Sequence, residues 1–170
     1  MTDPFLTDLQ AALPALMRTA RGLARSQDRA EDLVQDCVER ALKKRALWQP
    51  TGSLQGWLTR MMVNLYRSQL RSPGHAMNAV ALDELTTPLQ ARDELTPHLD
   101  LADTARALDQ LPEDQREVLM IVVLGGLTYA EAARALDLPL GTLMSRLGRA
   151  RAALRQMLNQ DTPQPQEALS

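Results

Sequence analysis

Residues 127–155 contain two short helical patterns separated by a turn. Thr128, with Glu131 three residues later, is the capping-box pattern that begins a helix. This helix is predicted to stop before Pro139, since a residue that precedes proline is disfavoured in the helical conformation. A second helix is predicted from Leu140 onward, where apolar residues recur at helical spacing. Two helices joined in this way predict a helix-turn-helix, whose second helix lies in the major groove of DNA.

The second of these helices is predicted to have an apolar side and a polar side. Leu143, Leu147 and Leu154 recur on the side that should pack inward. The polar side carries hydroxyl and guanidinium groups and no acid: Thr142, Ser145, Arg146 and Arg149. These four are the predicted DNA contacts, because arginine can bond guanine edges or phosphates. An ordinary helical hairpin with a solvated arginine face would share the pattern, so the motif alone leaves both interpretations open.

The string GTLMSRLGRAR, residues 141–151, resembles the pattern G-T-V-K-S-R-L-x-R-A-R of the C-terminal DNA-binding domain of extracytoplasmic-function (ECF) sigma factors. Residues 111–118, LPEDQREV, resemble the opening of the same domain. The resemblance implies contacts with the promoter −35 element and with the flap of RNA polymerase. Two residues depart from the family pattern: Met144 stands where lysine is usual, and Asp137 stands where the turn often has glycine. Because Asp tolerates the left-handed conformation better than most residues, the turn is still expected.

The net charge of −2 is distributed unevenly along the chain. Residues 1–71 carry a net charge of +4, and residues 72–100 and 101–140 carry −4 each. Residues 141–155 carry four arginines and no acid. Positive charge is therefore concentrated in the two segments that are expected to meet nucleic acid. The low total charge indicates that binding depends on a larger partner.

Apolar residues at helical spacing predict three helices in the first part of the chain, at about 5–25, 28–46 and 53–72. Asp28 and Ser53 are the expected N-caps of the second and third helices. The buried sides of the first and second helices are predicted to include Leu6 and Leu42, respectively. Pro14 is expected either in the first turns of its helix or at a kink.

The second helix carries a polar stripe at helical spacing, made of Asp32, Gln35, Asp36 and Glu39. A solvated acidic face would explain this stripe equally well. The string DRAEDLVQDCVERAL around it resembles the core-binding segment of ECF sigma factors. The resemblance implies that these four residues dock on a basic coiled coil of the largest RNA polymerase subunit.

The third helix carries a basic and polar face without acids, made of Arg60, Asn64, Arg67 and Arg71. The string GSLQGWLTRMMVNLYRSQLRS resembles the promoter −10 reader of the same family, which holds an unpaired base of the opened strand. The resemblance implies a pocket in the loop 47–52, including Trp48 and Gln49, with phosphate anchors on the helix. Trp57 is expected to be a core residue rather than a stacking platform, because a buried aromatic contributes much packing.

The predicted fold is all-α, with two small helical domains. The first, residues 1–72, corresponds to sigma region 2, and the second, residues 101–160, to sigma region 4. Residues 73–100 are predicted to be an acidic linker with a short helical piece near 83–92, because they contain three prolines and no aromatic residue. Residues 161–170 are predicted to be a flexible tail. Within the second domain, helices are expected at 101–111 and from Pro112, at a first helical position, to Gly125.

No catalytic or metal-binding constellation is recognisable in the sequence. Cys37 is the single cysteine, and His75 and His98 lie far apart without further ligand spacing. We therefore expect no enzymatic activity, no cofactor, no metal and no small-molecule substrate. The N-terminus lacks the pattern of a signal peptide and no apolar run is long enough to span a membrane, which indicates a cytoplasmic protein.

The function implied is that of a dissociable promoter-specificity subunit of RNA polymerase, with core polymerase, promoter DNA and an anti-sigma factor as partners. A sigma-like decoy that sequesters an anti-sigma factor would share the fold but lack DNA contacts. The arginines at 60, 67, 146 and 149 argue against a decoy, whereas Met144 keeps it open. A helix-turn-helix repressor would need dimer half-sites, and no dimerisation helix is evident. A helical adaptor that binds no DNA has the least support.

Overall fold

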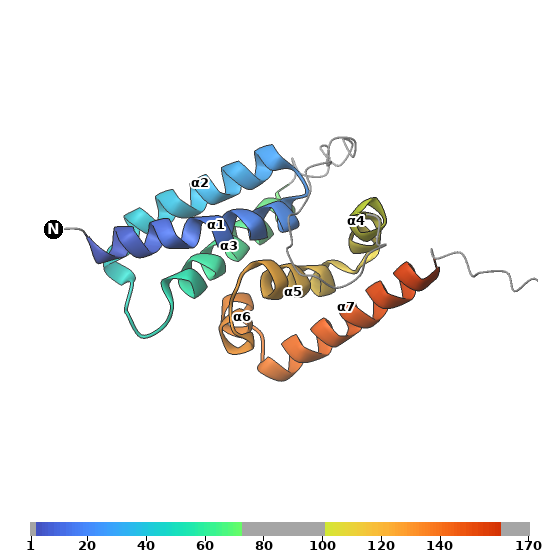
Figure 1. Ribbon diagram of the computed structural model, residues 1–170. Helices are drawn as coiled ribbons and strands as arrows, with labels where there is room; N and C mark the ends of the chain where they lie inside the picture. The colour runs from blue at the N-terminus through green and yellow to red at the C-terminus, as the bar shows by residue number, and fades with distance from the viewer. Residues whose placement is uncertain (1–2, 73–100, 161–170) are drawn as a thin grey trace, which may run out of the picture.

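The computed structural model describes residues 3–72 and 101–160, and within them the fold is all-α, as predicted (Figure 1). The elements are α1 (Pro4–Ala24), α2 (Gln27–Lys43), the 3-10 turn η1 (Arg45–Leu47), α3 (Leu54–Arg71), α4 (Leu101–Gln110), α5 (Glu113–Leu124), α6 (Tyr129–Leu136) and α7 (Leu140–Gln160). The predicted linker 73–100, its helical piece near 83–92 and the tail 161–170 lie outside the described residues.

Helices α1, α2 and α3 form a three-helix bundle in which each packs against the other two (Figure 1). Leu16, Leu33 and Leu58 are almost fully buried at its centre. The predicted cap of α3 is confirmed, because the Ser53 hydroxyl accepts a hydrogen bond of 3.0 Å from the Gly56 N–H.

The predicted bounds of the second helix were wrong at both ends. It begins at Gln27, and its N-cap is Ser26, whose side chain makes no capping hydrogen bond. Asp28 therefore lies inside the first turn, where a carboxylate still suits the positive end of the helix dipole. The helix ends at Lys43 rather than near residue 46, because the chain tightens into the 3-10 turn η1.

Two leucines that were predicted to be buried are exposed. Leu6 is 40% exposed and Leu42 is 45% exposed. In a bundle of only three helices each helix covers a limited arc of its neighbours, so apolar residues at the border of a stripe remain in contact with solvent. Pro14 lies in the middle of α1, not in its first turns, and it faces solvent there.

The turn between α6 and α7 forms as predicted. The capping box is complete: the Thr128 hydroxyl accepts a bond of 3.2 Å from the Glu131 N–H, and the Glu131 carboxylate accepts one of 2.9 Å from the Thr128 N–H. Asp137 ends α6 in the left-handed conformation, with φ 56° and ψ 45°. Leu143 and Leu147 are buried on α7. Pro112 immediately precedes α5 as its N-cap instead of occupying the first helical position.

The two helical groups pack directly against each other. Helix α5 lies against α1 and α6 lies against α3, so that one hydrophobic core runs through both groups (Figure 1). The approach of α1 to α5 is close at Gly22, where a Cβ atom would lie 2.8 Å from Met120 Sδ and from Leu124 Cδ1. Glycine at this position therefore permits the contact between the groups.

Candidate nucleic-acid and polymerase interface

Helix α7 presents the predicted −35 contacts on its solvent side. Ser145 and Arg149 are exposed, and Thr142 and Arg146 are half-buried. None of the residues of this helix is acidic, so its surface potential is positive. Arg146 forms an ion pair with another helix, because its Nε lies 3.5 Å from a carboxylate oxygen of Asp114 on α5. These four residues lie on one surface, and their contact with DNA stays a prediction.

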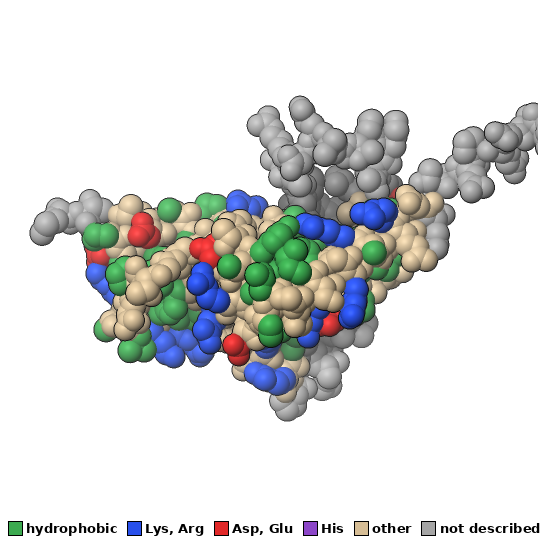
Figure 2. Space-filling model, turned by 90° about the horizontal axis from the view of Figure 1, so that it is seen from below, with side chains coloured by type: hydrophobic (Ala, Val, Ile, Leu, Met, Phe, Trp, Pro, Cys, Tyr) green, Lys and Arg blue, Asp and Glu red, His purple; other side chains and the backbone are tan. Residues whose placement is uncertain are grey.

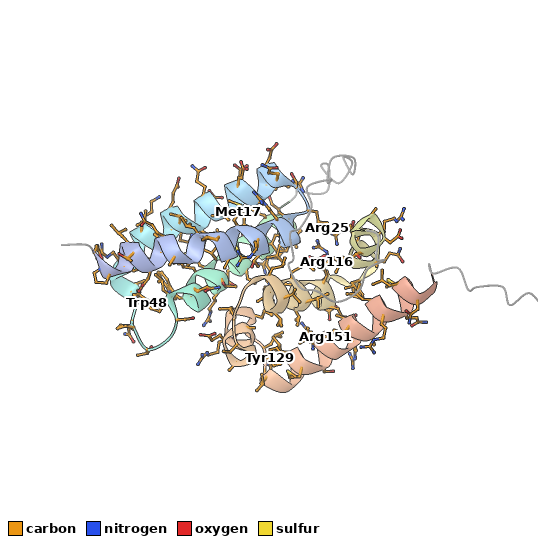
Figure 3. The ribbon with its side chains drawn as sticks, in the orientation of Figure 1. Met17, Arg25, Trp48, Arg116, Tyr129 and Arg151 are labelled. Atoms are coloured by element: carbon orange, nitrogen blue, oxygen red, sulfur yellow. The ribbon has the colours of Figure 1, made fainter. Side chains whose placement is uncertain are left out.

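Helix α3 and the preceding loop carry the predicted −10 contacts. Gln49, Arg60, Asn64 and Arg71 are exposed. Trp48 is half-buried, and its ring centroid lies 5.5 Å from that of Trp57. Trp57 in turn makes an edge contact with Phe5 at 6.5 Å, which agrees with its predicted role in packing. Trp48, in the loop before α3, lies well apart from Arg151 on α7 in Figure 3.

Arg67 differs from the other predicted −10 contacts, because it is engaged by the second helical group. Its Nε and Nη2 donate to the two carboxylate oxygens of Glu117 at 2.9 and 2.8 Å, and its Nη1 donates to the Leu136 carbonyl at 3.3 Å. Glu117 is only 8% exposed. The hydrogen bond that Arg67 donates to Glu117 raises the pKa of Arg67 above its ordinary value. A guanidinium bound in this way has few donors left for DNA phosphate.

Further polar contacts join the same two groups. The Tyr66 hydroxyl donates to Glu113 at 2.8 Å, and Arg25 lies 3.4 Å from Asp109 and 3.6 Å from Glu113. Burial, with the hydrogen bond to Glu113, raises the pKa of Tyr66. Arg25 has a left-handed backbone, with φ 56°, which is uncommon for a residue other than glycine. Arg25 is the C-cap of α1, and its backbone N–H donates to the Arg21 carbonyl at 3.3 Å.

Arg116 is the most deeply buried cation among the described residues. Its guanidinium donates to the carbonyls of Gly22 and Leu23 at the C-terminal end of α1. Figure 3 shows Arg116 and Arg25 close together between α1 and α5. Burial, followed by the charge of Arg25, lowers the pKa of Arg116. The carbonyls at a helix C-terminus stabilise such a cation, so Arg116 fastens α5 to α1.

The stripe on α2 that was predicted to bind core polymerase is open to solvent. Asp32, Gln35, Asp36 and Glu39 are all exposed, and the Gln35 amide donates to the Glu39 carboxylate at 3.4 Å. Among the described residues, α2 packs mainly against α1 and α3 rather than against the second helical group. The stripe is therefore accessible while the two groups are packed together, and its partner stays a prediction.

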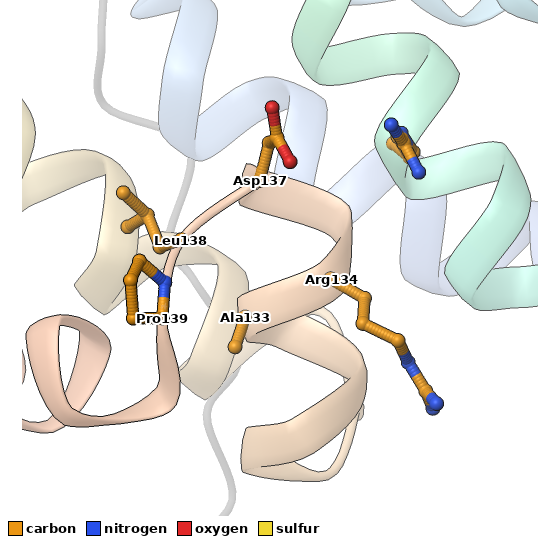
Figure 4. A pocket seen from close by; sticks show the side chains of 6 residues that line it. Ala133, Arg134, Asp137, Leu138 and Pro139 are labelled. Atoms are coloured by element: carbon orange, nitrogen blue, oxygen red, sulfur yellow. The ribbon is translucent and has the colours of Figure 1, made fainter.

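A shallow recess lies where α3 meets the turn between α6 and α7. It is lined by Arg60, Ala133, Arg134, Asp137, Leu138 and Pro139, and Figure 4 shows the side chains of Asp137 and Arg134 leaving α6 in different directions. The predicted −10 contact Arg60 therefore lies beside the turn of the helix-turn-helix. Together with the Arg67 contact, this brings part of the −10 surface against the second helical group.

The remaining chemistry of the described residues is structural. Burial raises the pKa of the Cys37 thiol to about 12, and Cys37 Sγ lies 3.4 Å from the Leu58 carbonyl. A thiol this buried and this weakly acidic is a core residue. Residues 3–72 and 101–160 contain no group of three potential metal ligands. In the same residues, no helix combines the length and apolar character of a bilayer span.

Two kinds of residue in this surface were missed by the sequence analysis. Arg151 and Arg155 are exposed on α7, one turn apart, and extend its basic surface toward the C-terminus. Their arginine-rich, acid-free segment was the signal that could have identified them. Asp114 and Glu117 hold predicted DNA contacts, but their partners lie far away in the sequence. The opposite net charges of residues 1–71 and 101–140 were the only sign of the pair between Arg67 and Glu117.

Comparison with known proteins gives matches for both helical groups. Residues 9–75 match the family described as Sigma-70 region 2, and residues 101–154 match the family described as Sigma-70, region 4. A protein named ECF RNA polymerase sigma factor EcfG, from Rhodopseudomonas palustris (strain TIE-1), is 37% identical over 161 residues. The matched segment covers 95% of this chain and 88% of the relative.

Two solved structures resemble the arrangement of both groups together. The sigma factor RpoE, in its co-crystal structure with the anti-sigma factor NepR from Bartonella quintana, is 32% identical, with a TM-score of 0.79. The match covers 95% of this chain and 100% of that one. CnrH, in complex with the cytosolic domain of CnrY, is 25% identical, with a TM-score of 0.68 over 93% of this chain and 89% of CnrH.

Proposed function

Because the chain belongs to the ECF sigma factors of RNA polymerase, we propose that it is a dissociable subunit that directs core polymerase to promoters and controls transcription initiation. Core polymerase supplies the catalysis, and the chain supplies the recognition of DNA. Its place of action is the cytoplasm, where core polymerase and promoter DNA meet. The observation that carries this function is the joint presence of both sigma regions, in order, in one chain.

In this function, α7 is the reader of the −35 element. Arg146 and Arg149 lie at the solvent side of a helix that carries no acid, with Thr142 and Ser145 beside them. The N-terminal part of a recognition helix contacts base edges, and residues farther along contact phosphates. The same domain is proposed to rest on the polymerase flap.

The −10 reader is assigned to α3 and the loop before it. Asn64, Arg60 and Arg71 are exposed and can anchor phosphates of the opened strand, while Trp48 and Gln49 border the loop that would hold a flipped base. Arg67 joins this set only after it leaves Glu117, because both of its pairing nitrogens are occupied in the packed arrangement. Promoter opening therefore requires the two sigma regions to separate.

We assign the binding of core polymerase to the stripe on α2. Its three carboxylates and one amide are exposed on a single side, which suits a basic coiled coil. The stripe is free before the sigma regions separate, so core polymerase can engage region 2 first.

Control by an anti-sigma factor is the regulatory part of the proposal. RpoE was solved with the anti-sigma factor NepR, and CnrH with the cytosolic domain of CnrY. The packed arrangement of this chain resembles each over most of its length. A partner that binds across both packed regions would keep Arg67 away from DNA.

The test is reconstitution of the full chain with core polymerase, followed by sequencing of the transcripts that the holoenzyme starts on genomic DNA. We expect start sites that share one −10 and one −35 element. Core polymerase alone serves as the control. A chain that binds an anti-sigma factor but starts no transcripts would be a decoy, and that result would overturn the proposal.

A further inference from the structure

Two apolar side chains in the first turns of α7 are exposed to solvent. Leu140 is 50% exposed and Met144 is 42% exposed, and they lie four residues apart on one side of the helix. Figure 2, which views the molecule from the side of α7, shows hydrophobic side chains gathered next to Lys and Arg side chains. The core of this helix is already completed by Leu143 and Leu147, which are 0% and 1% exposed. Met144 is therefore not needed to fill the core.

The position of Met144 on the helix follows from 3.6 residues per turn. It lies about 100° around the axis from the buried Leu143. Arg146 and Arg149 lie on the other flank, and the outermost ridge between the flanks carries Gly141, Ser145 and Gly148. A Cβ atom at Gly141 or Gly148 would have no neighbour within 4 Å, so this ridge is bare. A narrow ridge allows the helix to approach the groove floor, and side chains on both flanks then reach base edges.

The chemistry of a methionine in this place limits what it can bind. A thioether offers no hydrogen-bond donor, so it cannot replace an arginine or lysine at a guanine or a phosphate. It is flexible and polarizable and packs well against small apolar groups. The apolar group that distinguishes one base pair from another in the major groove is the C5-methyl group of thymine.

We propose that Met144 is a specificity-determining residue that packs against a thymine methyl group in the −35 element, on the groove side opposite to Arg146. This inference rests on the proposed function, because it requires α7 to lie in the major groove. It assigns thymine recognition to one flank of the helix and guanine or phosphate recognition to the other flank. An apolar residue at this position thus sets a base preference that a lysine would not set.

The test removes one methyl group at a time. The promoter found by transcript sequencing is made with deoxyuridine in place of each thymine of the −35 element, on either strand, and holoenzyme binding is measured in competition. For the parent we expect a loss of about three- to fivefold at one position, the effect of burying one methyl group. Met144→Ala should bind thymine and deoxyuridine equally at that position, and Met144→Lys should move the preference toward guanine. Val123→Ala, which trims an exposed apolar residue on α5, should keep the dependence of the parent.

Four results would overturn the inference. Equal methyl dependence in the parent and in Met144→Ala would show that another residue meets the methyl group, and the proposed function would stand. The inference is also overturned, and the proposed function also stands, if no deoxyuridine substitution weakens binding by the parent. A −35 element that contains no A·T pair would have the same two consequences. A parent holoenzyme without any preference at −35 would overturn both this inference and the role of α7. Circular dichroism of each variant shows whether the helix is retained.

Discussion

Arg146 and Arg149 lie on the same flank of α7 but in different surroundings. The Nε of Arg146 lies 3.5 Å from a carboxylate oxygen of Asp114, whereas Arg149 is exposed farther along the helix. A guanidinium fixed at Nε can present its terminal nitrogens to one guanine edge. We therefore assign base reading to Arg146 and phosphate anchoring to Arg149.

The first prediction compares Arg146→Ala with Arg149→Ala in holoenzyme. Loss of Arg146 should cost about 1–3 kcal/mol on the selected promoter and relax the preference at one base pair. Loss of Arg149 should weaken binding to all sequences alike and lower the salt slope by about one. Selection from a library randomised at −35, followed by salt titrations, separates these outcomes. If neither variant changes the selected sequence or the affinity, α7 is not the reader.

The N-caps of α6 and α2 differ in their side-chain hydrogen bonds, so the two helices can be compared for the contribution of a capping bond to stability. Thr128 and Glu131 form a reciprocal capping box at α6, whereas Ser26 is the N-cap of α2 without a side-chain bond. Thr128→Ala should lower the free energy of unfolding by about 1 kcal/mol, and Ser26→Ala should change it by much less. Urea denaturation of both variants measures the difference. Equal losses would show that the hydroxyl bond does not stabilise α6.

The same cap gives stability a pH dependence. The hydrogen bond from the Thr128 backbone N–H lowers the pKa of Glu131, followed by hydrogen bonds from the hydroxyls of Ser53 and Thr128. A carboxyl whose pKa is lower in the folded state stabilises the fold above its unfolded pKa, and this contribution disappears as pH falls through the folded pKa. Thr128→Ala keeps the backbone N–H and removes only the smaller hydroxyl bond, so urea denaturation at several pH values should show that it loses a small part of the acid sensitivity of the parent as pH falls from neutral to below 4.5, the ordinary value for Glu.

The second helix allows a charge-reversal test of core binding. Asp32→Lys with Asp36→Lys should weaken association with core polymerase and leave folding intact, because both carboxylates are exposed. Asp8→Lys is the control, since it reverses an exposed charge on α1, outside the stripe. Co-purification with core polymerase gives the measurement. Parent-like recovery of the double variant would remove the stripe from the interface.

Most of the helices could be predicted from the sequence, because their determinants are local. The cap at Ser53, the capping box at Thr128 and the left-handed Asp137 each depend on a few neighbouring residues. The ends of α2 could not be placed as well, since Ser26 caps the helix without a side-chain bond and η1 begins after Lys44. The exposure of Leu6 and Leu42 also depends on how many helices surround each stripe.

The packing of the two sigma regions could not be predicted, because its contacts join residues far apart in the sequence. Arg67 and Glu117 are 50 residues apart, and Arg116 and Gly22 are 94 apart. In each ion pair that joins the two groups, the acid comes from α4 or α5, and the base, Arg25 or Arg67, comes from the first group. The uneven charge along the chain therefore serves the contact between the regions as well as the contact with DNA.

The packed arrangement makes a prediction for the whole molecule. Glu117 holds Arg67 in a bidentate ion pair. The Glu117 side chain is buried, and the Arg67 side chain is about one-third exposed. Glu117→Gln keeps the shape of the side chain but removes its charge, so the packed state should lose roughly 1–2 kcal/mol. This shifts the equilibrium between packed and separated regions by about tenfold. Small-angle scattering should show a larger radius of gyration, and core polymerase should form open complexes faster. Asp103→Asn, which removes an ion pair to Arg106 within α4, should change neither quantity. If Glu117→Gln has the radius of gyration and the rate of open-complex formation of the parent, the ion pair does not hold the two regions together. In that case Arg67 does not need to leave Glu117 before promoters open.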